Sequence, residues 1–150
     1  MLTSLQDPRC DDAWQASGYP DGMKPAFTPS EADLVWNRAA AQRGDGAGDR
    51  HLSALLLAHG AVMNGGPGHA ASSLGSAELD AAVAGFRYFG LKELASVVQQ
   101  FPEAGSSDEE EDRLNEAYLV LAPEDSLLFD AFAAKFFGSP SDFEPIKEQR

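Results

Sequence analysis

The chain has few basic residues and a single cysteine, and each scarcity excludes a class of protein. It contains 11 Lys and Arg against 24 Asp and Glu, so its formal net charge is −13 over 150 residues. A field of that sign repels nucleic acids and anionic membranes, and direct binding to either is therefore not expected. Cys10 has no second cysteine with which to form an intrachain disulfide, which suits a reducing compartment.

Long apolar runs are also missing. The longest apolar stretch, residues 54–63, is interrupted by His59 and Gly60 and is too short to span a bilayer. The first residues lack a basic segment followed by an apolar one, so no secretion signal is expected. A hydrophobic content of 43% suffices for one core in a chain of this length. We therefore expect a cytoplasmic, single-domain protein.

What the chain does have is helix signals in close succession. Thr28-Pro29-Ser30-Glu31 offers an N-cap, a proline at the first helical position and a capping-box glutamate. Apolar residues then recur three or four apart, with no convincing strand pattern. The expected helices cover residues 28–42, 49–64, 76–89, 91–101, 107–121 and 123–137. The sequence thus predicts an all-α, single-domain bundle of about six helices, residues 28–138. An irregular N-terminal arm, residues 1–27, would precede it and a polar C-terminal tail, residues 139–150, would follow.

The most acidic segment is Asp-Glu-Glu-Glu-Asp at residues 108–112. Ser107 is expected to cap the helix that begins there, with Glu110 at the capping-box position. One interpretation is a solvated helix start, where the helix dipole favours acids. The other is a surface that binds a basic protein. The candidate partner-binding residues are Asp108, Glu109, Glu110, Glu111, Asp112, Glu116, Glu124 and Asp125. Clustered acids that repel one another are expected to have raised pKa values, and so to favour greater thermal stability near pH 5 than near pH 8.

His59 lies on the apolar face of the helix expected at residues 49–64 and allows two interpretations. It is either a core residue with its ring bonded to a loop carbonyl, or part of a pocket with Asn64, Gly65, Gly66 and His69. The pocket interpretation corresponds to an alternative function, a small-molecule-binding domain or a weak hydrolase. The three histidines do not have metal-ligand spacing, and no nucleotide-binding or nucleophile motif is present, so no metal, cofactor or catalytic residue is predicted.

Three segments, in this order along the chain, resemble a known family. Residues 55–66, Leu-Leu-Leu-Ala-His-Gly-Ala-Val-Met-Asn-Gly-Gly, lead to an Ala-rich helix that ends in Phe89-Gly90, and Ser141-Asp142-Phe143 follows much later. This order is similar to an all-helical family of domains of unknown function that includes an acidic bacterial DNA-mimic protein. Asn64, Gly65 and Gly66 match the family motif, whereas Pro67-Gly68-His69 replaces the aromatic residues that usually follow. The resemblance covers about residues 50–145 and implies a helical binding domain without enzymatic activity.

The first hypothesis is therefore an acidic, cytoplasmic protein-binding domain that engages a basic protein surface, with DNA mimicry as one form of that activity. A protein that neutralises a toxin, or another structural partner, fits the same charges. The sequence leaves the oligomeric state open.

Overall fold

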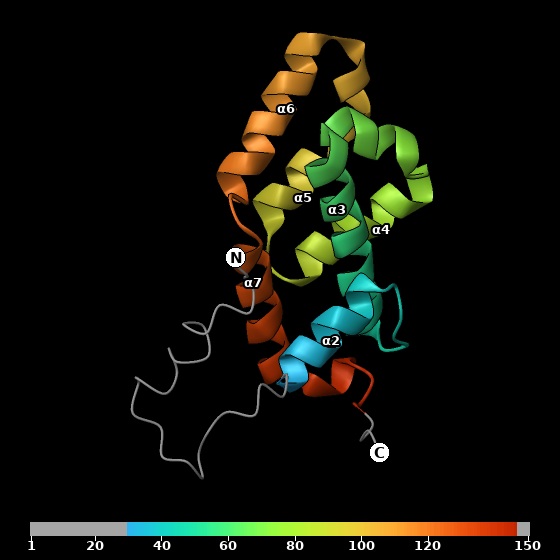
Figure 1. Cartoon of the computed structure of the whole chain (residues 1–150), viewed down its shortest axis with the longest axis vertical. Coiled ribbons are helices and arrows are strands. Elements are labelled where there is room, and N and C mark those ends of the chain that lie inside the picture. The colour runs from blue at the N-terminus through green and yellow to red at the C-terminus, as the bar shows by residue number, and fades with distance from the viewer. Residues whose placement is uncertain (1–29, 147–150) are drawn as a thin grey trace, which may run out of the picture.

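The computed structural model describes residues 30–146, and in this part of the chain every regular element is a helix, with no strand. Figure 1 shows the elements in order. They are α2 (Glu31–Ala40), α3 (Ala47–Ser73), α4 (Ser76–Tyr88), α5 (Lys92–Gln99), η2 (Phe101–Ser106), α6 (Asp108–Leu121), α7 (Asp125–Gly138) and η3 (Pro140–Asp142). The predicted all-α class is confirmed. The expected arm at residues 1–27 lies outside the described residues, and the division into arm, domain and tail stays a prediction.

Helix α2 begins two residues later than the sequence indicated. Ser30, not Thr28, is its N-cap: the Ser30 hydroxyl accepts from the Asp33 N–H at 3.1 Å, and the Asp33 carboxylate accepts from the Ser30 N–H at 3.2 Å. This capping box uses Ser and Asp where Thr and Glu were expected. The helix ends at Ala40, because Gln42 takes a left-handed backbone with φ of 62°.

Helix α3 is longer than predicted and bends in the middle. Residues 64–68 were expected to end the helix and turn the chain, but the helix continues to Ser73 through a kink at Gly66, whose φ is 87°. Pro67 then starts the second half, because its missing N–H and fixed φ suit the first position of a helix. The predicted helix end at Gly66 is thus confirmed by a non-helical backbone there, and the difference is that a second helical segment follows at once in place of a loop.

The next two helices match the prediction closely. Gly75 caps α4, with its N–H donating to Glu78 at 2.9 Å. Gly90 stops α4 as predicted: it has φ of 80°, and the Leu91 N–H reaches back to the Phe86 carbonyl at 2.8 Å. Helix α5 is followed by η2, in which Pro102 occupies an early position. Gly105 and Ser106, expected in a hinge, belong to η2.

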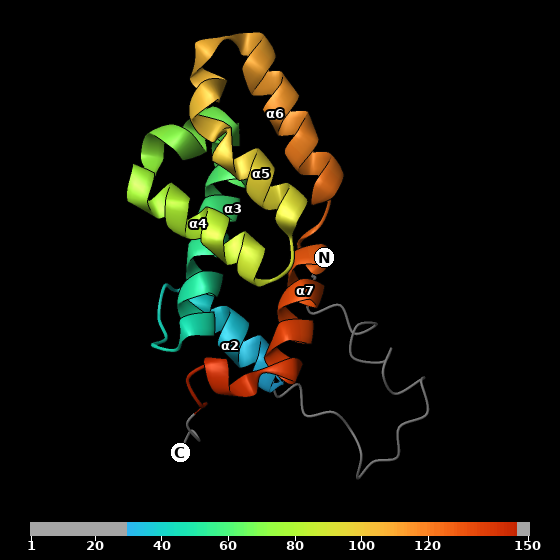
Figure 2. The ribbon, with the colours of Figure 1, turned by 180° about the vertical axis from the view of Figure 1, so that it is seen from behind.

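Helix α3 occupies the middle of the molecule and contacts α2, α4, α6 and η2. Figures 1 and 2 show α6 and α7 following one another along one side of the molecule, while α2 crosses its lower end. Helix α7 is attached mainly by aromatic side chains: Phe132 lies 5.7 Å from both Trp36 and Phe143 and 6.2 Å from Phe89, centroid to centroid. None of the helices in residues 30–146 has the length and apolar character to cross a membrane.

The start of the expected polar tail packs on the helices. Phe143 is 3% exposed and lies against Phe89, Phe132 and Phe136. The next residue, Glu144, donates its N–H to the Asp49 carboxylate at 2.6 Å. Residues 140–146 are therefore fixed to the ends of α2 and α3.

Candidate partner-binding site

The acidic segment forms the first turn of α6, where the helix dipole and a side-chain cap stabilise it. The Ser107 hydroxyl accepts from the Glu110 N–H at 3.1 Å, as the sequence predicted for the cap. The Glu110 carboxylate does not return the bond to Ser107. It pairs with Arg113 at 2.7 Å, and this hydrogen bond lowers the pKa of Glu110. Glu110 is thus an internally paired acid, and its pKa moves opposite to the expected rise.

Glu111 reaches back to the kink of α3. Its carboxylate accepts from the Gly68 N–H at 2.8 Å, and a Cβ built on Gly66 would lie 2.5 Å from the same carboxylate. Gly68 is in the first turn after the kink, where helical N–H groups lack partners and the dipole favours an anion. Glu111 therefore caps the second half of α3 and holds α6 against it.

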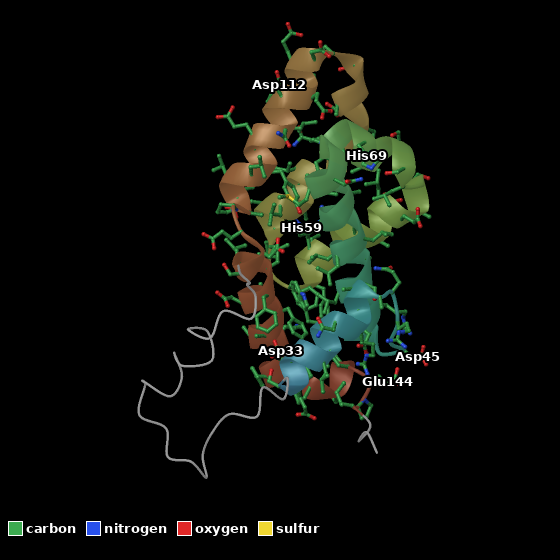
Figure 3. The ribbon with its side chains drawn as sticks, viewed as in Figure 1. Asp33, Asp45, His59, His69, Asp112 and Glu144 are labelled. Atoms are coloured by element: carbon green, nitrogen blue, oxygen red, sulfur yellow. The ribbon has the colours of Figure 1, made fainter. Side chains whose placement is uncertain are left out.

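The other acids of α6 point away from the body. Asp108, Glu109, Asp112 and Glu116 are all exposed. Since residues three or four apart on a helix lie on one face, Glu109, Asp112 and Glu116 form a line along the outer side of α6, which we call the acidic stripe. Figure 3 shows Asp112 near the upper, outer end of the molecule. The run of five acids thus divides into two internal partners and three outward residues.

His59 is 7% exposed and bridges three helices. Its Nδ1 lies 2.7 Å from the Tyr118 hydroxyl on α6, and its Nε2 lies 2.8 Å from the Asp125 carboxylate on α7. Because a carboxylate only accepts, Nε2 carries the hydrogen in this bond, and in the neutral ring Nδ1 then accepts from the Tyr118 hydroxyl. Burial, and to a lesser extent the Asp125 charge, raise the pKa of Tyr118.

Asp125 completes this bridge from the surface. Its side chain is 76% exposed, although one oxygen is bonded to the buried imidazole. His59 therefore fixes the start of α7 relative to α6. It is a buried residue, as the first interpretation held, but its ring is bonded to two side chains and not to a loop carbonyl.

The residues proposed for a pocket do not converge on His59. Asn64 and Gly65 are exposed in the first half of α3, and His69 is exposed in its second half. A Cβ on Gly65 would lie 2.6 Å from the His69 ring, so that ring lies directly beside Gly65. Figure 3 shows His59 lower in the molecule than His69. Gly65, Gly66 and His69 thus surround the kink near Glu111, while His59 faces Tyr118 and Asp125.

A buried ion pair that the sequence analysis missed lies at the opposite end of the molecule. Asp49 is 0% exposed, and its carboxylate accepts from Arg38 at 2.5 Å, from the Gly46 N–H at 3.0 Å and from the Glu144 N–H. Arg38 also donates to the Glu144 carbonyl at 2.8 Å. The available signal was Asp49 at the third position of a helix after Gly46, which is typical of a capping acid.

Surface grooves also lie at this end. One of ≈490 Å³ is lined by Leu34, Asn37, Arg38, Arg43, Gly44, Glu144, Pro145 and Ile146. Of the two arginines that line this groove, Arg38 is paired with the buried Asp49 carboxylate. Within residues 30–146, no group of three or more His, Cys, Asp or Glu side chains is placed to hold a metal ion.

The described residues thus form an all-helical domain with an acidic outer stripe on α6 and an Asn-Gly-Gly kink in α3. The model of the DMP19-like protein family matches residues 47–149. The chain belongs to this family, and the match covers α3 to the last described residue, so both the kink and the stripe lie within it. Helix α2 and the residues before it precede the matched region. No curated protein and no solved structure matches the chain.

Proposed function

We propose that this chain is a protein-binding domain that engages a basic, DNA-binding protein by presenting carboxylates in place of DNA phosphates. The observation that carries the proposal is the acidic stripe of Glu109, Asp112 and Glu116, exposed along one side of α6. Membership of the DMP19-like family supports this proposal, because the all-helical family that the sequence resembles includes an acidic DNA-mimic protein.

The surrounding charges strengthen the field of the stripe. Residues 108–130 contain nine Asp and Glu and one basic residue, Arg113, which is paired with Glu110. The exposed acids Asp125 and Asp130 on α7, and Glu124 directly before it, extend the same sign along the side of the molecule formed by α6 and α7. A field of one sign over a long edge steers a basic protein to it and raises the rate of association.

The spacing of the stripe resembles that of a nucleic acid, with a lower density. Carboxylates three or four residues apart on a helix are separated by about 4.5–6 Å along its axis, at 1.5 Å per residue. Phosphates of one DNA strand follow at about 3.4 Å along the duplex axis. Because Glu110 and Glu111 have partners within the chain, the exposed acids Glu109, Asp112 and Glu116 form one line, with Asp108 beside its start.

The alternative function, a small-molecule site or weak hydrolase at His59, has less support. A general base needs a ring nitrogen within reach of its substrate. Both nitrogens of His59 are bonded to side chains, and the ring is nearly enclosed. The other candidates, Asn64 and His69, lie around the kink of α3.

A salt titration with a competitor tests the proposal. Core histones serve as a generic basic DNA-binding probe. They are first bound to a fluorescent DNA duplex, and the chain is then added. We expect the chain to displace the duplex, with an affinity for the histones that falls steeply as salt rises. An affinity that is unchanged between low and moderate salt, or binding to the histones without release of the duplex, contradicts mimicry.

A further inference from the structure

The outer side of α6 and α7 carries exposed apolar side chains among its acids. The large hydrophobic residues exposed in residues 30–146 are Met63, Leu119, Val120, Leu127 and Phe137, and three of these five fall between residues 119 and 127. Val120 is 70% exposed and Leu127 is 37% exposed. Single exposed apolar residues are ordinary, but a group of them at one junction between helices indicates a contact surface.

Val120 continues the acidic stripe along α6. It follows Glu116 by four residues, which places both on the same face of the helix. Leu127 stands on the other side of the three-residue connection 122–124, in the first turn of α7. Exposed acids and exposed apolar residues therefore alternate along the chain here: the acids up to Glu116 are followed by Leu119 and Val120, then by Glu124 and Asp125, and then by Leu127 and Asp130. We call this group of apolar residues the apolar step.

The bonds of His59 fix the two sides of the apolar step to each other. Tyr118 directly precedes Leu119 on α6, and Asp125 lies two residues before Leu127 on α7, and both are bonded to the same imidazole. An apolar surface held in one arrangement loses little conformational entropy when a partner covers it. The acids around it favour a basic partner over a second copy of this surface, because two copies would bring like charges together.

We propose that the apolar step binds an apolar side chain of the basic partner. This side chain lies between positive charges of the partner, and the acidic stripe contacts those charges. This inference rests on the proposed function and specifies its partner: a basic segment with an apolar anchor, and not a uniformly cationic one. Charge then sets the rate and the salt dependence of association, while burial of the anchor slows dissociation.

Two synthetic peptides of equal length and charge separate the two contributions. One alternates Arg with Leu, and the other alternates Arg with Gly. With the full chain we expect the Arg-Leu peptide to bind about tenfold more tightly, as burial of one aliphatic side chain predicts. The variant Val120→Ser with Leu127→Ser should lose this preference and keep its affinity for the Arg-Gly peptide. Phe137→Ser, which removes an exposed apolar residue at the other end of α7, should keep the preference.

Other outcomes separate a failure of the apolar anchor from a failure of the proposed function. Equal, salt-dependent binding of both peptides to the unaltered chain overturns the apolar anchor but leaves the proposed function standing. Failure of both peptides to bind at low salt contradicts the proposed function as well. Sedimentation that shows a dimer of the unaltered chain, and a monomer of the Val120→Ser, Leu127→Ser variant, overturns the inference by assigning the step to self-association. Circular dichroism confirms that each variant is folded.

Discussion

Gly66 is the residue on which the shape of α3 depends. Its φ of 87° is rarely adopted by other residues, and a Cβ there would meet the Glu111 carboxylate at 2.5 Å. We expect Gly66→Ala to lower the free energy of unfolding by about 1 kcal/mol or more. Gly60 in the same helix is the matched control: its Cβ would meet nothing within 4 Å, so Gly60→Ala should be stabilising by about 0.5–1 kcal/mol. Equal effects in urea denaturation would show that the kink is not required.

Asp49 and Arg38 fix the other end of the molecule. Removing one member of a buried ion pair leaves the other charge without a partner, which typically costs about 3–5 kcal/mol. We therefore expect Asp49→Ala to lose stability on that scale and to loosen residues 140–146, which Asp49 holds through the Glu144 N–H. Asp80→Ala, at an exposed position on α4, should change stability by no more than about 0.5 kcal/mol. A small effect at Asp49 in chemical denaturation would show that the pair is dispensable.

His51 makes stability depend on pH. Its ring stacks on Tyr88 at 4.5 Å, and burial and the neighbouring Arg50 lower the pKa of His51, against the opposing effect of Asp142. The folded chain then binds the proton less readily than the unfolded chain, so stability is lost as the pH falls below about 6.5, the ordinary value for histidine. The lowered pKa of Glu110 acts in the same direction at more acidic pH.

These shifts oppose the expectation from sequence that acidification to pH 5 stabilises the protein. We expect the melting temperature to fall between pH 7 and pH 5, and the fall to be smaller in His51→Gln, which cannot take up the proton. The comparison of the two proteins in the same buffers isolates His51 from the carboxylates. An identical fall in both, or a rise in the unaltered chain, contradicts this assignment.

At the scale of elements, Glu111 connects two helices that the sequence treats as independent. Its bond to Gly68 spans 43 positions along the chain. Loss of a charge-assisted hydrogen bond of this kind costs about 1–3 kcal/mol, so Glu111→Ala should destabilise the fold by that amount. Glu109→Ala, two positions earlier on the acidic stripe, should leave the melting temperature nearly unchanged and should weaken partner binding instead. If both variants have the same stability, Glu111 belongs with the outward acids.

The helices themselves were largely predictable, because their apolar spacing and caps are local. Ser107 and Gly90 end or begin helices through bonds to residues within five positions, and both were identified. The sequence predicted a turn at the kink because Asn-Gly-Gly-Pro-Gly is a local turn signal. The helix that follows is capped by the Glu111 carboxylate, which is distant in the sequence. Asp49 depends on a bond to a residue 95 positions away, and Phe143 packs on Phe89 from a different helical region, and no local pattern specifies either contact.

The sequence predicted which acidic residues belong to the candidate site, but not the directions in which their side chains point. The acidic run was visible, yet the sequence did not indicate that Glu110 would pair with Arg113 or that Glu111 would turn inward. It likewise assigned His59 and Asp125 to separate sites, whereas folding brings them to 2.8 Å. The amount of charge follows from the residues present, but the face on which it is exposed depends on which acids pair with other residues of the chain.

At the scale of the whole molecule, the central claim is that the position of the charges, and not the total of −13, creates the binding surface. Two triple variants remove the same amount of charge from different places. The first changes the acidic stripe, with Glu109→Gln, Asp112→Asn and Glu116→Gln. The second changes exposed acids on other helices, with Glu31→Gln, Asp80→Asn and Glu93→Gln. Both raise the net charge by three, so long-range attraction falls equally.

The measurement is the affinity of each triple variant for core histones at one moderate salt concentration, relative to the unaltered chain. We predict that the stripe variant loses tenfold or more, because three contacts that contribute about 0.5 kcal/mol or more each are removed together, while the control variant loses little. Equal losses in the two variants would contradict the account, because binding would then depend on net charge alone.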